Sequence, residues 1–191
     1  MLEKLVKENR SRRSFRADEK ISHEILIELC EIARYTPAAM NLQPLKYRLV
    51  TEEQELSLML ANTRWASSLS QELPPKGHAP TGYIVICHDT AITPTKPIFM
   101  IDVGIVAQTI MLAATERGLG GCIIGSGSAE KLSKILQISD GLVPMLVLGL
   151  GVPDETVVLT DAKDGQVRYY RDENNVHYVP KRPLDELILP S

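Results

Sequence analysis

A chain of 191 residues, 44% of them hydrophobic, is long enough for one well-filled core and predicts a single domain over 1–191. A net charge of -3 and an aromatic content of 5% argue against a nucleic-acid partner, because neither positive charge nor stacking surface is abundant. The three cysteines lie far apart in apolar segments, which is typical of reduced thiols in a cytoplasmic protein. We find no signal-peptide pattern, and the longest uncharged apolar run, 103–115, is too short to span a membrane.

The hydrophobic pattern predicts most of the secondary structure. In chain order it predicts a helix over 1–10, a helix over 22–36, a strand over 46–50, a helix over 52–60, a strand over 83–87, a helix over 102–117, a strand over 122–124, a helix over 130–136, a strand over 142–150 and a β-hairpin of 166–171 with 176–179. Ser22 is a suitable N-cap, and Pro37 should end the second helix. Residues 62–79 are polar and contain prolines, so we expect a helix and then a mobile loop there. Helices and strands alternate unevenly, which favours an α+β or mixed sheet covered by helices.

The helix predicted over 102–117 is apolar nearly all round, so we expect it to be buried in the core or against a second subunit. Asp102 is predicted to lie at its N-terminus, where a carboxylate is favourable. The glycines that follow do not form a dinucleotide fingerprint, because the order is helix, turn, strand. The strand leads into Gly-Ser-Gly-Ser at 125–128, where bare backbone can approach a flat ligand, although a tight turn without a ligand is the alternative.

A basic cluster, RSRRSFR, occupies residues 10–16. Such a cluster is most often a solvated surface. Here forked guanidinium donors alternate with hydroxyl donors, a combination that suits a phosphate group.

Taken together, several separated segments resemble the FMN-dependent nitroreductase family. They are RRSFR at 12–16, PAAMNLQP at 37–44, the helix and glycine strand at 102–126, and PKRPL at 180–184. Their order and separation make the match specific, and it covers nearly the whole chain. The resemblance implies an α+β fold in three layers, with a mixed, mainly antiparallel sheet flanked by helices.

The resemblance also implies a set of FMN contacts. Arg12 and Ser14 would contact the phosphate, with Arg13 among the same contacts, and Lys181 or Arg182, or both, would meet it from the other end of the chain. A cation at the N1 and O2 edge of the flavin stabilises the reduced ring, and this role falls to Arg16, reinforced by Lys76. The residues that would border or cover the ring are Ala38, Ala39, Met40, Asn41, Ile123, Ile124, Gly125 and Ser126.

By the same resemblance, the activity would be a ping-pong transfer of two electrons from NADH or NADPH to an electron-poor acceptor: a nitroaromatic, a quinone or an activated alkene. The expected assembly is a homodimer with FMN at its interface and a C-terminal arm, about 176–191, that reaches the partner subunit. No acid–base residue can be named. We expect no metal, because the histidines are scattered without metal-ligand spacing; they are His23, His78, His88 and His177.

Some positions depart from the family pattern and leave the substrate open. Ala38 and Ala39 stand where the family often has Ser or Gly, Leu45 stands where it has Trp, and Gly125 stands where one branch has Glu. The chain also lacks a long insertion that shapes the substrate pocket in some members. The alternatives are a specialised flavin protein that dehalogenates a substrate or fragments the flavin, a flavin-storage protein and, from another class, an RNA binder using residues 10–16.

Overall fold

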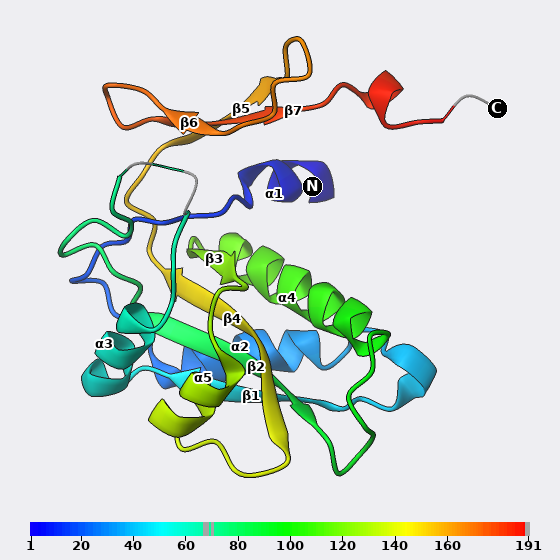
Figure 1. Ribbon diagram of the computed structural model, residues 1–191. Coiled ribbons are helices and arrows are strands. Elements are labelled where there is room, and N and C mark those ends of the chain that lie inside the picture. The colour runs from blue at the N-terminus through cyan, green and yellow to red at the C-terminus, as the bar shows by residue number, and fades with distance from the viewer. Residues whose placement is uncertain (67–68, 70, 190–191) are drawn as a thin grey trace. The chain divides into compact units, whose positions relative to one another are not determined.

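The computed structural model describes residues 1–66, 69 and 71–189, and it divides into two compact units, 1–153 and 154–191. The elements of the first unit are α1 (Leu2–Glu8), α2 (His23–Ala33), the 3-10 turn η1 (Ala39–Asn41), β1 (Leu45–Val50), α3 (Glu53–Ala61), β2 (Gly82–Asp89), α4 (Phe99–Glu116), β3 (Gly120–Ile124), α5 (Ala129–Ile135) and β4 (Leu142–Gly151) (Figure 1). Apart from the helix expected within 62–79, each helix and strand predicted up to residue 150 is confirmed, with ends that differ by at most about three residues.

The strands of the first unit form an antiparallel sheet in the order β1-β2-β4-β3. Alternate residues of the central strand β2 face opposite sides. Ile84 and Ile86 pack in a core with α2 and α4, whereas Tyr83 and Val85 pack in a second core on the other side, which includes residues of α3 and α5. The first unit therefore has three layers, and the predicted α+β class with a mainly antiparallel sheet is confirmed.

The central helix α4 begins at Phe99, three residues before the predicted start. Asp102 still lies in the first turn of the helix, where a carboxylate is favourable as predicted, and the residue is 3% exposed. By length and composition alone, α4 is the one helix in the described part of the chain that could cross a membrane, but half of it is buried. Burial of this kind is typical of the core helix of a globular unit.

The helix expected within 62–79 is not found in 62–66, 69 or 71–79, while 67, 68 and 70 lie outside the described residues. Trp65 is buried over Gly149, where a Cβ atom would come within 2.6 Å of the indole ring. The backbone of Arg64 is hydrogen-bonded in both directions to the Ser126 hydroxyl, at 2.9 Å each. Tertiary contacts with the sheet thus replace the expected helical hydrogen bonds at the start of this segment.

The second unit contains a three-stranded sheet, in which β7 (His177–Lys181) lies between β5 (Val157–Asp161) and β6 (Tyr170–Arg171), and a 3-10 turn, η2 (Leu184–Glu186). The predicted hairpin is confirmed as the antiparallel pair β6–β7, although β6 is only two residues long. Its turn is stabilised by Asp172, whose carboxylate accepts hydrogen bonds from the amides of Asn174 and Val176, both at 2.9 Å. Strand β5 pairs with β7 in parallel and was not predicted.

Candidate functional site

The basic segment, residues 10–16, is extended and lies against the ends of β3 and β4. The Arg12 amide donates to the carbonyl oxygen of Gly121 in β3 at 2.7 Å, and the Arg16 amide donates to the carbonyl oxygen of Val152 at 2.9 Å. A Cβ at Gly120 would come within 2.7 Å of Arg12 Cγ, so glycine is needed for this close approach. The segment is therefore held to the sheet at both of its ends.

Phe15 anchors the basic segment to the core. Its side chain is fully buried, and its ring lies edge-on to Trp65, with 6.3 Å between the ring centroids. Its amide donates to the carbonyl oxygen of His78 at 3.0 Å. A Cβ at Gly151 would come within 2.6 Å of the Phe15 ring, so this glycine makes room for the aromatic side chain. Ser14 is also buried, and Arg16 remains exposed beside them.

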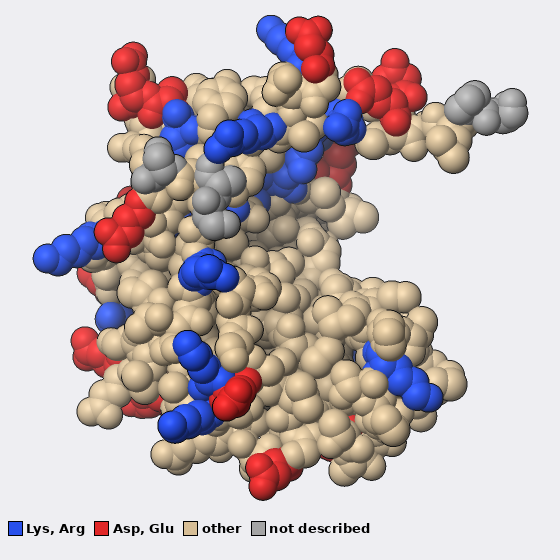
Figure 2. Space-filling model, in the orientation of Figure 1, with Lys and Arg blue, Asp and Glu red and all other residues tan. Residues whose placement is uncertain are grey.

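Positive charge is concentrated in the basic segment. Burial, and then the neighbouring charge of Arg12, lower the pKa of Arg10. Arg16 pairs with Glu19 at 2.7 Å, but an exposed pair of this kind is worth only about 0–1 kcal/mol and is easily exchanged for another anion. On the face seen in Figure 2, Lys and Arg side chains interrupt a surface that is mostly uncharged. The local chemistry of the basic segment suits an anion.

An uncovered surface follows along β3 and its C-terminal extension. Ile123 is 42% exposed on a strand whose other residues are buried, and a Cβ at Gly125 would meet no described atom within 4 Å. Ser126 is fixed by its two hydrogen bonds to the backbone of Arg64. At about 3.3 Å per residue, Ile124 lies roughly 10 Å along the strand from Gly121, which is bonded to the basic segment. A ligand with an anionic tail and a flat head could lie along this strand.

The loop at 38–43, whose residues 38–41 are predicted to border the flavin ring, has an unusual backbone. Met40, Asn41 and Gln43 adopt φ values of 52°, 54° and 50°, in the left-handed region. Each such non-glycine residue costs about 1–2 kcal/mol, so the surroundings must hold the loop in place. Asp102 in α4 provides one such contact, because its two carboxylate oxygens lie 3.0 and 3.1 Å from the Ala39 amide.

In a single chain this loop and the basic segment lie at opposite ends of α4 (Figure 1). Asp102 is near the start of the helix. Asn9, next to the basic segment, donates to the Met111 carbonyl at 2.9 Å and to the Thr115 hydroxyl at 2.8 Å near its end. At 1.5 Å per residue, Asp102 and Thr115 are about 20 Å apart along the helix. One chain therefore brings the basic segment and 123–126 together, but not the loop.

The remaining predicted residues are placed as follows. Lys76 is exposed in the loop that includes His78, whose carbonyl is bonded to Phe15, so its backbone lies beside the basic segment. Lys181 ends β7 in the second unit, and Arg182 pairs there with Glu186 at 2.9 Å. The contact of these two residues with a phosphate stays a prediction.

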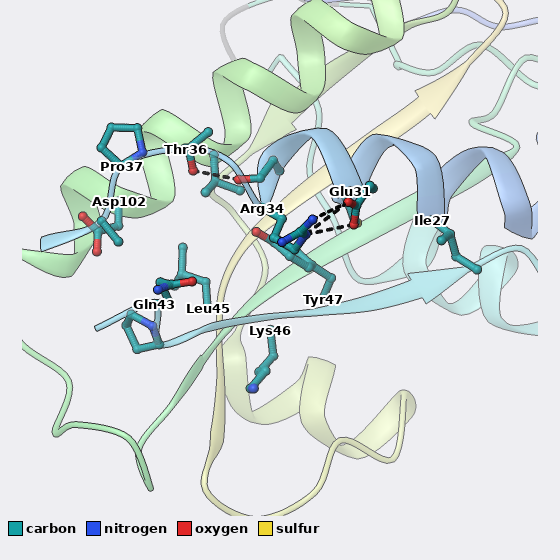
Figure 3. Close-up of a pocket in the computed structure, with 15 residues that line it drawn as sticks. Ile27, Glu31, Arg34, Thr36, Pro37, Gln43, Leu45, Lys46, Tyr47 and Asp102 are labelled. Atoms are coloured by element: carbon teal, nitrogen blue, oxygen red, sulfur yellow. Dashed lines mark hydrogen bonds and ion pairs between the residues drawn. The ribbon is translucent and has the colours of Figure 1, made fainter. Parts of the chain in front are cut away.

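A cavity of about 450 Å³ lies between α2, β1 and both ends of the loop (Figure 3). Its lining is largely apolar and includes only Ala38 from the predicted cofactor residues. Burial raises the pKa of Cys30 and of Tyr47 each to about 12, so both stay protonated at neutral pH. The Glu31–Arg34 ion pair, at 2.7 Å, stands at its edge. The cavity borders the loop from behind and is separate from the surface along β3.

Sequence reasoning missed two residues at this site. Arg64 was not predicted to contact 123–126, and Asp102 was not predicted to hold the loop. Both interactions span more than 60 residues of sequence and leave no local pattern that could reveal them. In the part of the chain that the structure describes, no cluster of three or more His, Cys, Asp or Glu residues could hold a metal ion.

Residues 6–152 match the sequence model of the Nitroreductase family. The chain belongs to this family. The predicted resemblance is confirmed, and the protein is an oxidoreductase. A relative from Archaeoglobus fulgidus, provisionally named NADH dehydrogenase/NAD(P)H nitroreductase, is 28% identical over 170 residues, which cover 85% of this chain and 93% of the relative.

Solved structures of nitroreductases share the fold of this family member. A nitroreductase family protein from Streptococcus pneumoniae TIGR4 superposes with a TM-score of 0.70 at 21% identity and covers 100% of both chains. An FMN-dependent nitroreductase from Clostridium difficile R20291 superposes with a TM-score of 0.64 at 21% identity, covering 84% of this chain and 91% of that one.

Proposed function

We propose that this nitroreductase family member is an FMN-dependent enzyme that takes two electrons from NADH or NADPH and passes them to an electron-poor small molecule, such as a nitroaromatic, a quinone or an activated alkene. The observation that carries the proposal is the basic segment, held by backbone hydrogen bonds beside the uncovered end of β3. The basic segment would bind the anionic tail of the cofactor, and the uncovered end of β3 would accept its flat ring.

The residues of the basic segment fit the phosphate of FMN. Arg12 and Arg13 are half-buried and directly precede the buried Ser14 in the segment, so they can offer forked donors, and Ser14 a hydroxyl donor, to a phosphate. Each charge-assisted hydrogen bond contributes roughly 1.5–3 kcal/mol, and two or three would retain the cofactor at low concentration. The phosphate would also relieve the repulsion between Arg10 and its neighbour Arg12.

Residues 123–126 fit the ring. Gly125 has no side chain to obstruct a flat ligand, and the backbone there is held by the Ser126–Arg64 hydrogen bonds. Arg16, with Lys76 from the adjacent loop, would supply positive charge at the polar edge of the ring by exchanging its pair with Glu19. When bound, FMN supplies the two-electron chemistry, while these residues bind and orient it.

We propose further that two chains assemble around a two-fold axis, so that the 38–41 loop of each chain reaches the basic segment of the other. A separation of about 20 Å within one chain rules out contact of both groups with one ring, whereas antiparallel pairing of two α4 helices would bring them together. The side of α4 that carries Ile101 and Gly104 supports this pairing. Ile101 is 58% exposed, and a Cβ at Gly104 would meet no described atom within 4 Å. The arm at 176–191, with Lys181 and Arg182, would then reach the partner.

We also propose a soluble protein of the cytoplasm. Cys30, Cys87 and Cys122 form no disulfide with one another, which suits a reducing compartment.

The test is the absorbance of the purified protein, its response to NADH and NADPH without oxygen, and its mass in solution. Visible flavin bands at one FMN per chain, bleaching by either nucleotide and return of the bands with a quinone or a nitroaromatic are the expected results, with a mass of two chains. Bound flavin that neither nucleotide reduces would favour storage or another donor. A colourless protein that FMN does not bind, retained on heparin in a salt-dependent manner, would overturn the proposal.

A further inference from the structure

The loop at 38–43 is closed by hydrogen bonds of its own. Its hydrogen bonds from the Asn41 amide to the Ala38 carbonyl, 2.9 Å, and from the Leu42 amide to the Ala39 carbonyl, 3.1 Å, close turns inside the loop. The cavity of about 450 Å³ lies behind it and is lined by Ala38 and Gln43 from the loop itself. Close packing therefore does not impose the left-handed backbone from this side.

The contact that ties the loop to the rest of the unit is the one between Asp102 and the Ala39 amide, at 3.0 and 3.1 Å. The two residues are 63 positions apart, and Asp102 is 3% exposed and lines the same cavity. Ala39 is followed directly by Met40 and Asn41, the first two left-handed residues. A bond at this amide fixes the point from which the loop turns toward its exposed tip.

We infer that Asp102 is a positioning residue, whose carboxylate holds the Ala39 amide and thereby sets the conformation in which Ala38 to Asn41 meet the flavin ring. This inference rests on the proposed function for the identity of the ligand, but the tether itself belongs to the free protein. Asp102 does not touch the ring. It acts through the backbone of Ala39, and an acceptor oxygen at this position is the property that matters.

The experiment compares Asp102→Ala and Asp102→Asn with the wild-type full-length protein. The first readout is hydrogen exchange of the Ala39 amide in protein freed of flavin, and the second is the dissociation constant of added FMN. Thr90→Val is the control, because it removes a side-chain hydrogen bond to the Gly141 carbonyl, 2.8 Å, that also joins two distant loops but touches no predicted flavin contact.

In Asp102→Ala we expect the Ala39 amide to exchange at least about 10-fold faster and FMN to bind about 10- to 100-fold more weakly. In Asp102→Asn the side-chain amide oxygen can still accept the hydrogen bond from Ala39. The exchange rate of the Ala39 amide and the dissociation constant of FMN should therefore lie within about threefold of the wild-type values. Unchanged exchange at Ala39 in the alanine variant, or equal losses in the alanine and asparagine variants, would overturn the inference. If the wild type bound no FMN, the proposed function would fail, while the exchange rates would still decide whether Asp102 holds the loop.

Discussion

Gly151→Ala should loosen the basic segment without changing any residue that is predicted to contact FMN. Gly151 ends β4, and a Cβ there would lie 2.6 Å from Phe15 Cδ1 and 2.9 Å from its Cβ and Cγ. A rotation of the Phe15 side chain cannot relieve these three contacts, because one of them is with the Cβ atom of Phe15 itself. Phe15 must shift, and with it the segment that carries Arg12 and Arg16.

The magnitude follows from overpacking of a core site, which typically costs about 1–3 kcal/mol. Gly104→Ala is the matched control for the unfolding measurement only, because within one chain the added methyl group would meet no described atom within 4 Å, whereas Gly104 lies on the face proposed to pair with a second chain. There the gain in helix propensity should stabilise the fold by about 0.5–1 kcal/mol. The two glycine-to-alanine substitutions should therefore change the free energy of unfolding in opposite directions.

Urea denaturation followed by circular dichroism measures the free energy of unfolding, and fluorescence titration measures the affinity for FMN. For Gly151→Ala we expect a loss of about 1–3 kcal/mol and FMN binding weakened about 10-fold or more. If Gly151→Ala were as stable as Gly104→Ala and bound FMN as the wild type does, Phe15 would not be the anchor of the basic segment.

Four further predictions concern the cofactor, the assembly and the thiols. Arg12→Ala should weaken FMN binding about 10- to 100-fold, and unchanged cofactor content after dialysis would remove Arg12 from the phosphate site. Arg16→Ala should retain more FMN than Arg12→Ala but be bleached more slowly by NADH, whereas equal bleaching rates would refute its role at the ring. Gly104→Leu should leave the fold intact and lower the dimer fraction measured by light scattering. Ser57→Leu, at an exposed position of α3, is the control. With its pKa raised to about 12 by burial, Cys30 should hold only about 10⁻⁴ of its thiol as thiolate at pH 8 and react with iodoacetamide after unfolding but not before.

Much of the local structure could be predicted from the sequence, because it depends on neighbouring residues. Ser22 accepts a hydrogen bond from the Ile25 amide at 3.4 Å, as expected of an N-cap. The β-branched run at 83–87 forms a strand buried on both faces, and the apolar helix α4 lies in the core. The predicted start of α4 was three residues too late, although Asp102 does lie in the first turn of the helix as expected of an N-terminal carboxylate. Its hydrogen bond with the distant Ala39 amide was not predicted.

Composition and periodicity were sufficient to indicate the α+β class and most of the elements up to residue 150, and the resemblance of several separated segments indicated the nitroreductase family, which the match over residues 6–152 confirms. Only the tertiary structure decided which residues meet: Asp102 with Ala39, Arg64 with Ser126, and Phe15 with Gly151. It also showed that the 38–43 loop and the basic segment lie at opposite ends of one helix. The physical reason is that capping and amphipathic burial are read over a few neighbouring residues, whereas a hydrogen bond or close contact between distant segments depends on where the whole chain places them.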